Sequence, residues 1–177
     1  MGNIELTILI SGTALIIALN WWASIKDGRY HGIPRIFAFE SVLILALLNF
    51  RSWFENPFST NQIASWILLA LSIPSALSGV IFLKLFGKSQ DKFENTTELV
   101  VAGPFRYIRH PMYLSLFLLA AGILLKNINV LTISLATKNG VAVFITAKME
   151  EKILIHKFGN RYIDYMKKTK MFIPYIL

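Results

Sequence analysis

Long apolar segments constrain the fold of this chain more than any other feature of its sequence. A helix needs about 20 predominantly apolar residues to cross the roughly 30 Å hydrocarbon layer of a membrane. Because lipid offers the backbone no hydrogen-bond partners, a segment inside it folds as a helix or as part of a closed barrel. The sequence contains five candidate helical spans, at residues 4–23, 36–50, 63–86, 112–125 and 128–147. We therefore predict an all-α, polytopic membrane protein with about five transmembrane helices.

The last two of these segments predict a helical hairpin. Only Lys126 and Asn127 separate them, and so short a link forces the two helices to run antiparallel. The fourth segment is short for a span, and the polar residues 138–140 interrupt the fifth. Because polar groups are costly against lipid, we expect the hairpin to face protein or a water-filled cavity. Further on, residues 151–165 carry an apolar stripe at helical spacing, which predicts a cytosolic amphipathic helix near the C-terminus.

The basic residues predict an orientation in the membrane. If the N-terminus lies outside, 15 of the 18 lysines and arginines fall on the inner side, whereas Arg51 and Lys126 lie outside and Lys138 lies within a span. The inner residues are Lys26, Arg29, Arg35, Lys84, Lys88, Lys92, Arg106, Arg109, Lys148, Lys152, Lys157, Arg161, Lys167, Lys168 and Lys170. This asymmetry satisfies the positive-inside rule and predicts a cytoplasmic C-terminus. A prokaryotic cell membrane is the expected location, because no organelle-targeting segment is present.

Composition excludes several other classes of protein. Only 16% of the residues are charged, against about 25% in soluble domains, and the basic residues alternate with apolar segments, so we expect no nucleic-acid partner. The absence of cysteine excludes disulfides and thiolate metal sites, and three scattered histidines predict no metal centre. Glu40 and Lys138 fall within predicted spans, where a charge costs about 2.5–3.5 kcal/mol. An interfacial position or snorkelling explains them as well as a function does.

A first group of polar and aromatic residues precedes the fourth span. Gly103-Pro104 is typical of a turn, and Arg109 and His110 lie directly before Pro111, which is suited to begin a helix. A helix N-terminus favours an anion, and the aromatic residues of this segment would line a pocket for a small charged organic molecule. An interfacial belt of arginine and tyrosine is the alternative interpretation.

A second group follows the fifth span. Glu150 shares a helical face with Asn139 and Thr146, while Glu151 begins the apolar stripe described above. Such a carboxylate pair can orient a substrate or balance a cation. Alternatively, it is a solvated acidic step between Lys148 and Lys152. Because both groups lie on the predicted inner side, we divide the chain into N-terminal spans with a cytosolic loop, 1–98, and a catalytic region, 99–177.

The segment 103–113, GPFRYIRHPMY, resembles the signature of the integral-membrane methyltransferases. This superfamily includes isoprenylcysteine carboxyl methyltransferase and the phospholipid methyltransferases. The tail is similar to the C-terminal pattern of the superfamily at Glu150-Glu151, Phe158-Gly159, Tyr162, Tyr165, Thr169 and Pro174. The resemblance covers residues 99–174, and the first three spans resemble the family in hydropathy alone.

The resemblance implies S-adenosyl-L-methionine bound in a pocket open to the cytosol, with a lipid-like acceptor entering from the membrane. The implied roles fall into three sets. They are catalytic Glu150 and Arg109; cofactor-binding Val100, Tyr107, His110, Tyr113 and Glu151; and substrate-binding Asn139 and Thr146. Arg109 and His110 would hold the methionyl carboxylate, and the tyrosines would stack on adenine or face the sulfonium. A Rossmann-type cofactor site is excluded because no G-x-G-x-x-G follows a strand, and no metal is required.

One departure from the family bears on the acceptor. Carboxyl methyltransferases of this family tend to carry an arginine four residues before the first glutamate, where this chain has Thr146. Threonine cannot bind a carboxylate bidentately, so a prenylcysteine-like carboxylate, a phospholipid amine and related groups all stay open as acceptors. Two other functions also stay open. One is an NADPH-dependent membrane reductase of the sterol-reductase type, and the other is a non-enzymatic transport or assembly protein in which Glu40, Lys138 and Asn139 line a path.

Overall fold

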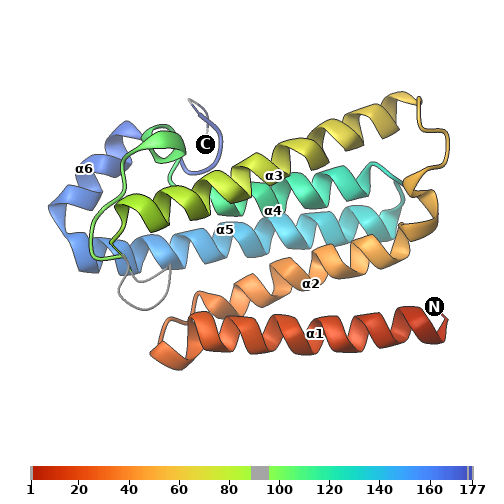
Figure 1. Cartoon of the computed structure of the whole chain (residues 1–177), viewed down its shortest axis with the longest axis horizontal. Helices are drawn as coiled ribbons and strands as arrows, with labels where there is room; N and C mark the ends of the chain where they lie inside the picture. Colours follow the sequence, from red (N-terminus) through yellow and green to blue (C-terminus); the bar gives the residue numbers. More distant parts are fainter. Residues whose placement is uncertain (1, 89–95, 175, 177) are drawn as a thin grey trace. The chain divides into compact units, whose positions relative to one another are not determined.

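The computed structural model describes residues 2–88, 96–174 and 176, and helices joined by turns and loops make up most of this part of the chain (Figure 1). Lys92, one of the basic residues assigned above to the inner side, lies outside the described residues. The helices are α1 (Asn3–Ala23), α2 (Gly32–Leu48), α3 (Thr60–Phe86), α4 (Pro111–Leu124), α5 (Val130–Phe158) and α6 (Asn160–Lys168), with short 3-10 helices η1 (Ile25–Asp27), η2 (Phe50–Trp53) and η3 (Gly103–Arg106). The described residues form no strand, which confirms the all-α class.

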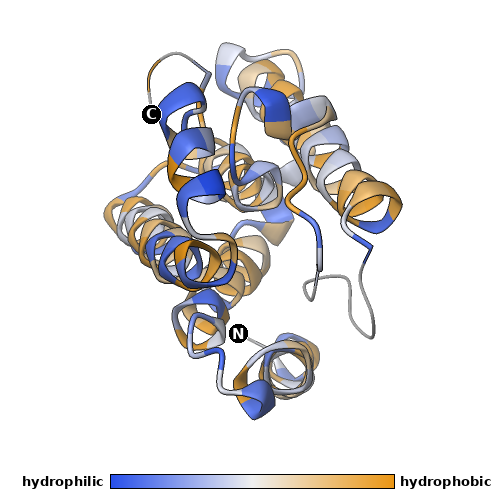
Figure 2. Cartoon of the chain, turned by 90° about the vertical axis from the view of Figure 1, so that its left-hand side faces the viewer, coloured by the Kyte–Doolittle hydropathy of each residue, from blue (hydrophilic) through white to orange (hydrophobic). Residues whose placement is uncertain are grey.

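Three helical segments are long and apolar enough to cross a membrane. They are Asn3–Asp27, Thr60–Phe86 and Val130–Phe158. Hydrophobic residues run along the long helices (Figure 2). Many of their large apolar side chains are exposed. Exposed apolar surface on this scale fits lipid better than water. The chain is therefore an integral membrane protein, whereas spans at α2 and at the shorter α4 stay predictions.

The hairpin of α4 and α5 differs in detail from the sequence prediction. Helix α4 ends at Leu124 and α5 begins at Val130, so the link is longer than Lys126 and Asn127. Asn129 caps α5, because its side-chain oxygen accepts hydrogen bonds from the backbone N–H groups of Leu131 and Thr132 at 3.0 and 3.1 Å. Helix α5 then continues without a break through the polar residues 138–140.

The chain forms two compact units that interleave along the sequence. The first unit comprises residues 1–71 and 116–146, and the second comprises residues 72–115 and 147–177. Helices α3, α4 and α5 each contribute to both. This division does not test the functional boundary predicted between residues 98 and 99.

In the first unit, α1 and α2 run side by side as a hairpin (Figure 1). The buried Arg35 guanidinium donates hydrogen bonds to the side-chain oxygens of Asn20 and Ser24, at 2.6 and 2.8 Å. Further along the pair, the hydroxyl of Thr13 donates a 2.7 Å hydrogen bond to Glu40. Hydrogen bonds between polar side chains therefore link these two apolar helices. A polar group that is buried away from water is costly unless it finds a hydrogen-bond partner in the protein.

The rest of the first unit packs around Leu45, Leu69, Ala120 and Ile123. Lys126, predicted to lie on the outer side, is buried beside this core. Its ammonium donates a 2.8 Å hydrogen bond to Gln62 and lies 3.5 Å from the centre of the Trp66 ring. Burial disfavours the charged form of Lys126 and lowers its pKa. The hydrogen bond to Gln62 and the face of the Trp66 ring offset part of this desolvation cost.

Candidate functional site

A tight turn places the Arg-His pair in the second unit. Gly103 has φ +56°, and a Cβ atom at this position would collide with the ring of Phe82, so only glycine fits. Pro104 is the second residue of η3, and its carbonyl accepts hydrogen bonds from the N–H groups of Tyr107 and Ile108. This turn delivers the following two residues, 109 and 110, to the start of α4.

The C-terminal segment pairs with the backbone of the same two residues. Arg109 N–H donates to the carbonyl of Lys170 at 2.8 Å, and His110 N–H donates to the carbonyl of Met171 at 3.1 Å. The N–H of Lys170 donates in return to the carbonyl of Tyr107, also at 3.1 Å. The anion site expected at this helix start therefore lacks two of the backbone donors that the sequence placed there.

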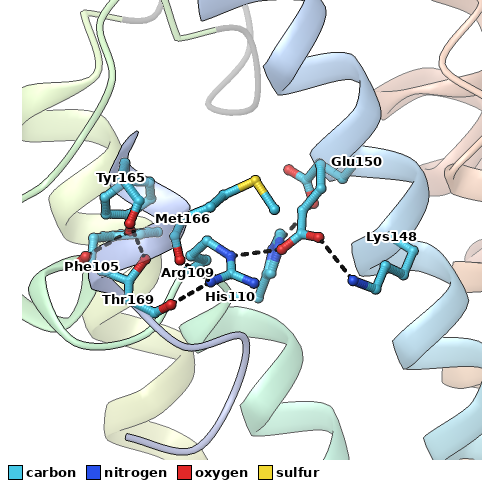
Figure 3. Close-up of polar contacts among 9 residues, drawn as sticks. Phe105, Arg109, His110, Lys148, Glu150, Tyr165, Met166 and Thr169 are labelled. Carbon is cyan, nitrogen blue, oxygen red and sulfur yellow. Dashed lines mark hydrogen bonds and ion pairs between the residues drawn. The ribbon is translucent and has the colours of Figure 1, made fainter. Parts of the chain in front are cut away.

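A buried ion pair joins the turn to α5 (Figure 3). Arg109 Nε lies 2.7 Å from Glu151 Oε1, and the two side chains are only 9% and 3% exposed. The Nη1 group of Arg109 donates to the carbonyl of Thr169 at 2.6 Å and, more weakly, to that of Met166 at 3.4 Å. The guanidinium is thus directed at partners within the protein, and its planar fork suits three acceptors in different directions.

His110 lies between the two carboxylates without a short hydrogen bond to either. Its Nε2 atom is 3.5 Å from Glu151 Oε1, and its Nδ1 atom is 3.8 Å from Glu150 Oε2. The buried Nε2 atom has no hydrogen-bond partner among the described residues. The ring instead stacks on Tyr113, with centroids 5.4 Å apart, and packs at an angle against Phe172 at 6.1 Å.

The two carboxylates differ in their access to solvent. The Glu150 side chain is 26% exposed, whereas that of Glu151 is almost fully buried. Lys148 is half-exposed, and its ammonium lies 3.5 Å from the second oxygen of Glu151. Because the charge of Glu151 is compensated within the protein, Glu150 is the carboxylate that an incoming group can reach.

Helix α6 packs two tyrosines against the site. The hydroxyl of Tyr165 donates a 2.6 Å hydrogen bond to the carbonyl of Phe105, which fixes α6 to η3. Burial raises the pKa of Tyr165, and burial together with the carboxylates of Glu151 and Glu150 raises that of Tyr162. Both phenols therefore stay neutral at physiological pH.

The second unit brings together five of the residues that the sequence singled out, namely Arg109, His110, Tyr113, Glu150 and Glu151. Val100 is buried in the same unit, whereas the Tyr107 side chain is largely exposed. The two expected substrate residues belong to the first unit. There Asn139 donates to the carbonyl of Ala38 at 2.9 Å, and Thr146 donates to that of Ala142 at 2.7 Å.

Sequence reasoning included the C-terminal segment in the predicted catalytic region, 99–177, but named no site residue after Glu151. The carbonyls of Met166, Thr169, Lys170 and Met171 all accept hydrogen bonds from Arg109 or His110. A backbone carbonyl is present at every position and carries no sequence signal. The sequence signals for a buried role of this segment are the tail pattern that includes Tyr165 and Thr169 and the apolar residues Met171 and Phe172.

These features define an all-helical integral membrane protein with a cluster of buried acidic, basic and aromatic side chains in one compact unit. The family model described as phospholipid methyltransferase matches residues 60–161, more than half of the chain. The chain belongs to this family, which confirms the resemblance to the membrane methyltransferases. No curated protein matches the chain. The matched region includes Arg109, His110, Glu150 and Glu151 but ends before Tyr162.

Proposed function

We propose that the protein is a membrane-embedded methyltransferase that uses S-adenosyl-L-methionine and acts on a small lipidic acceptor. The observation that carries this proposal is the clustering of Arg109, His110, Glu150 and Glu151 within the part matched by the family. Two segments far apart in the sequence supply these side chains. The family match favours methyl transfer over the reductase and transport alternatives.

The residues of the cluster suit such a cofactor. A sulfonium is a cation, and cations are stabilised by aromatic faces and by carboxylates. The cluster offers the rings of His110 and Tyr113 and the accessible carboxylate of Glu150. The unpartnered Nε2 atom of His110 is a buried polar group for which a ligand could provide the missing partner. When bound, the cofactor would supply an activated methyl group.

In this proposal, His110 and Tyr113 contact the cofactor, with Val100, Tyr107 and Glu151 as further members of its site. Glu150 orients the acceptor and, for an amine acceptor, takes up its proton. Arg109 holds Glu151 in place, because its guanidinium is already directed at that carboxylate and at two main-chain carbonyls. Most of the catalytic effect would come from holding the methyl group and the acceptor about 3–3.5 Å apart, away from water.

The acceptor and the topology belong to the same proposal. A phospholipid amine, a prenylcysteine-like carboxylate or a related headgroup would enter from the membrane, with Asn139 and Thr146 along its path. Five spans, an outside N-terminus and a cytoplasmic C-terminus would expose the cluster to cytosolic cofactor. A prokaryotic cell membrane is the proposed location.

Titration calorimetry tests this proposal. The detergent-purified protein is titrated with S-adenosylmethionine and S-adenosylhomocysteine, beside His110→Ala and the matched control His156→Ala, which removes an exposed histidine. We expect micromolar binding that is lost in His110→Ala alone, followed by transfer of a labelled methyl group to a lipid fraction. If folded wild-type protein binds neither compound, even with mixed lipids present, the proposal is wrong.

A further inference from the structure

We infer that the C-terminal strap, residues 165–172, positions His110 for ligand binding and that Phe172 is the residue that sets the orientation of its imidazole ring. The strap lies beyond the part matched by the family, which ends at residue 161. The choice of ligand rests on the proposed function, whereas the positioning itself rests on contacts within the second unit.

Backbone hydrogen bonds connect the strap to residues 107–110, with donors on both segments. Two N–H groups, those of Arg109 and His110, donate to consecutive carbonyls of the strap at Lys170 and Met171, and the Lys170 N–H donates back to Tyr107. Residues 108 and 170 consequently form a parallel bridge. Three main-chain hydrogen bonds in so short a stretch fix where the Cα atom of His110 lies, because each is directional.

Side chains secure the strap at two further points. The Tyr165 hydroxyl holds the carbonyl of Phe105 at 2.6 Å, and Arg109 holds the carbonyl of Thr169 at the same distance. Arg109 also binds Glu151, so a single guanidinium ties the strap to α5. The strap is thus connected to η3, to the residues before α4 and to α5, the three elements that surround His110.

The orientation of the His110 ring rests on aromatic packing together with long polar contacts to the two carboxylates. The side chain is 4% exposed, yet its nitrogen atoms lie 3.5 and 3.8 Å from the nearest carboxylate oxygens, beyond good hydrogen-bond distance. The rings of Tyr113 and Phe172 are its aromatic neighbours. Tyr113 comes from α4, the helix that His110 precedes, so Phe172 is the aromatic contact contributed by a distant part of the chain.

The test measures the His110 ring directly and ligand binding separately. Histidine is labelled with ¹⁵N, and its ring resonances are recorded in detergent for wild type, Phe172→Leu, Phe172→Tyr and Ile173→Ala. The chain has three histidines, and His110→Ala assigns the resonance of interest. Phe172→Tyr keeps the aromatic ring, and Ile173→Ala is a control at a neighbouring exposed position. Calorimetry with S-adenosylhomocysteine gives the Kd of each variant.

We expect Phe172→Leu to move the His110 resonance and to raise the Kd about threefold to tenfold, the effect of one aromatic contact. Phe172→Tyr should keep the His110 resonance and the Kd close to their wild-type values, and Ile173→Ala should change neither. An unmoved His110 resonance, or a moved resonance with unchanged Kd, overturns the inference. Should Phe172→Leu not fold, Phe172→Met replaces it. A wild-type protein that binds no ligand refutes the proposed function and the ligand part of this inference, while the resonances still decide whether Phe172 orients His110.

Discussion

Replacing one partner of the buried pair of Arg109 and Glu151 should cost more stability than replacing one partner of an exposed ion pair. At a distance of 2.7 Å, two unit charges attract by about 6 kcal/mol at an effective dielectric constant of about 20. Removing both charges from water offsets much of this attraction. Removing one partner alone leaves the other charge buried and uncompensated, which costs about 3–5 kcal/mol.

The assay is a thermodynamic cycle of Arg109→Gln, Glu151→Gln and the double variant. The free energy of unfolding is measured in mixed micelles by circular dichroism, because all four tryptophans lie in the first unit and would not report on the pair. Each single variant should lose about 3–5 kcal/mol. The double variant should lose less than the sum of the two, by about 2 kcal/mol or more, because its two sites are in contact.

An exposed pair on α6 provides the matched control. Asp164 and Lys167 lie 2.8 Å apart, against 2.7 Å for the buried pair, but their side chains are 64% and 70% exposed. Solvent screens such a pair, so Asp164→Asn should leave the unfolding transition unchanged. Additive losses in the first cycle, or equal effects for the buried and exposed pairs, would show that burial does not control the energy of this interaction.

Three further outcomes are expected. Gly103→Ala places a Cβ atom against the ring of Phe82 at a left-handed backbone position, which should distort the turn before His110. Cofactor affinity measured by calorimetry should therefore fall by about tenfold or more. Unchanged affinity would mean that the turn does not position the site. Lys126→Met leaves the buried side-chain oxygen of Gln62 without its 2.8 Å hydrogen-bond donor. The free energy of unfolding, followed by tryptophan fluorescence, should fall by about 1–3 kcal/mol. An unchanged free energy of unfolding would contradict the role of this contact. Burial raises the pKa of Tyr162 in the folded protein, so the unfolded chain releases this proton first and stability should fall as the pH rises above about 10. Circular dichroism of Tyr162→Phe should show a smaller alkaline loss, and an identical loss would assign the effect to other groups.

Local sequence patterns predicted the all-helical class and the approximate places of the long apolar helices, and they named the residues of the candidate site. Apolar segments predicted the helices because hydropathy and backbone satisfaction in lipid act over a single helix. The signature around His110 and the paired glutamates named the candidate site residues, whose roles stay a prediction; the family match shows that these segments belong to the family. The break expected at residues 138–140 is absent, because a helix satisfies its own backbone whatever the polarity of its side chains.

The tertiary structure decided which partner each of these side chains has. From the sequence, Arg109 appeared free to bind a ligand carboxylate, yet it binds Glu151, 42 residues away, and the carbonyl of Thr169, 60 residues away. The sequence placed Lys126 in a short link on the outer side and gave no sign of its partners, whereas the structure buries it beside Trp66. Sequence patterns report the periodicity and composition of single segments. A hydrogen bond or ion pair depends on where two distant segments meet, and main-chain carbonyls take part in such contacts without leaving any mark on the sequence.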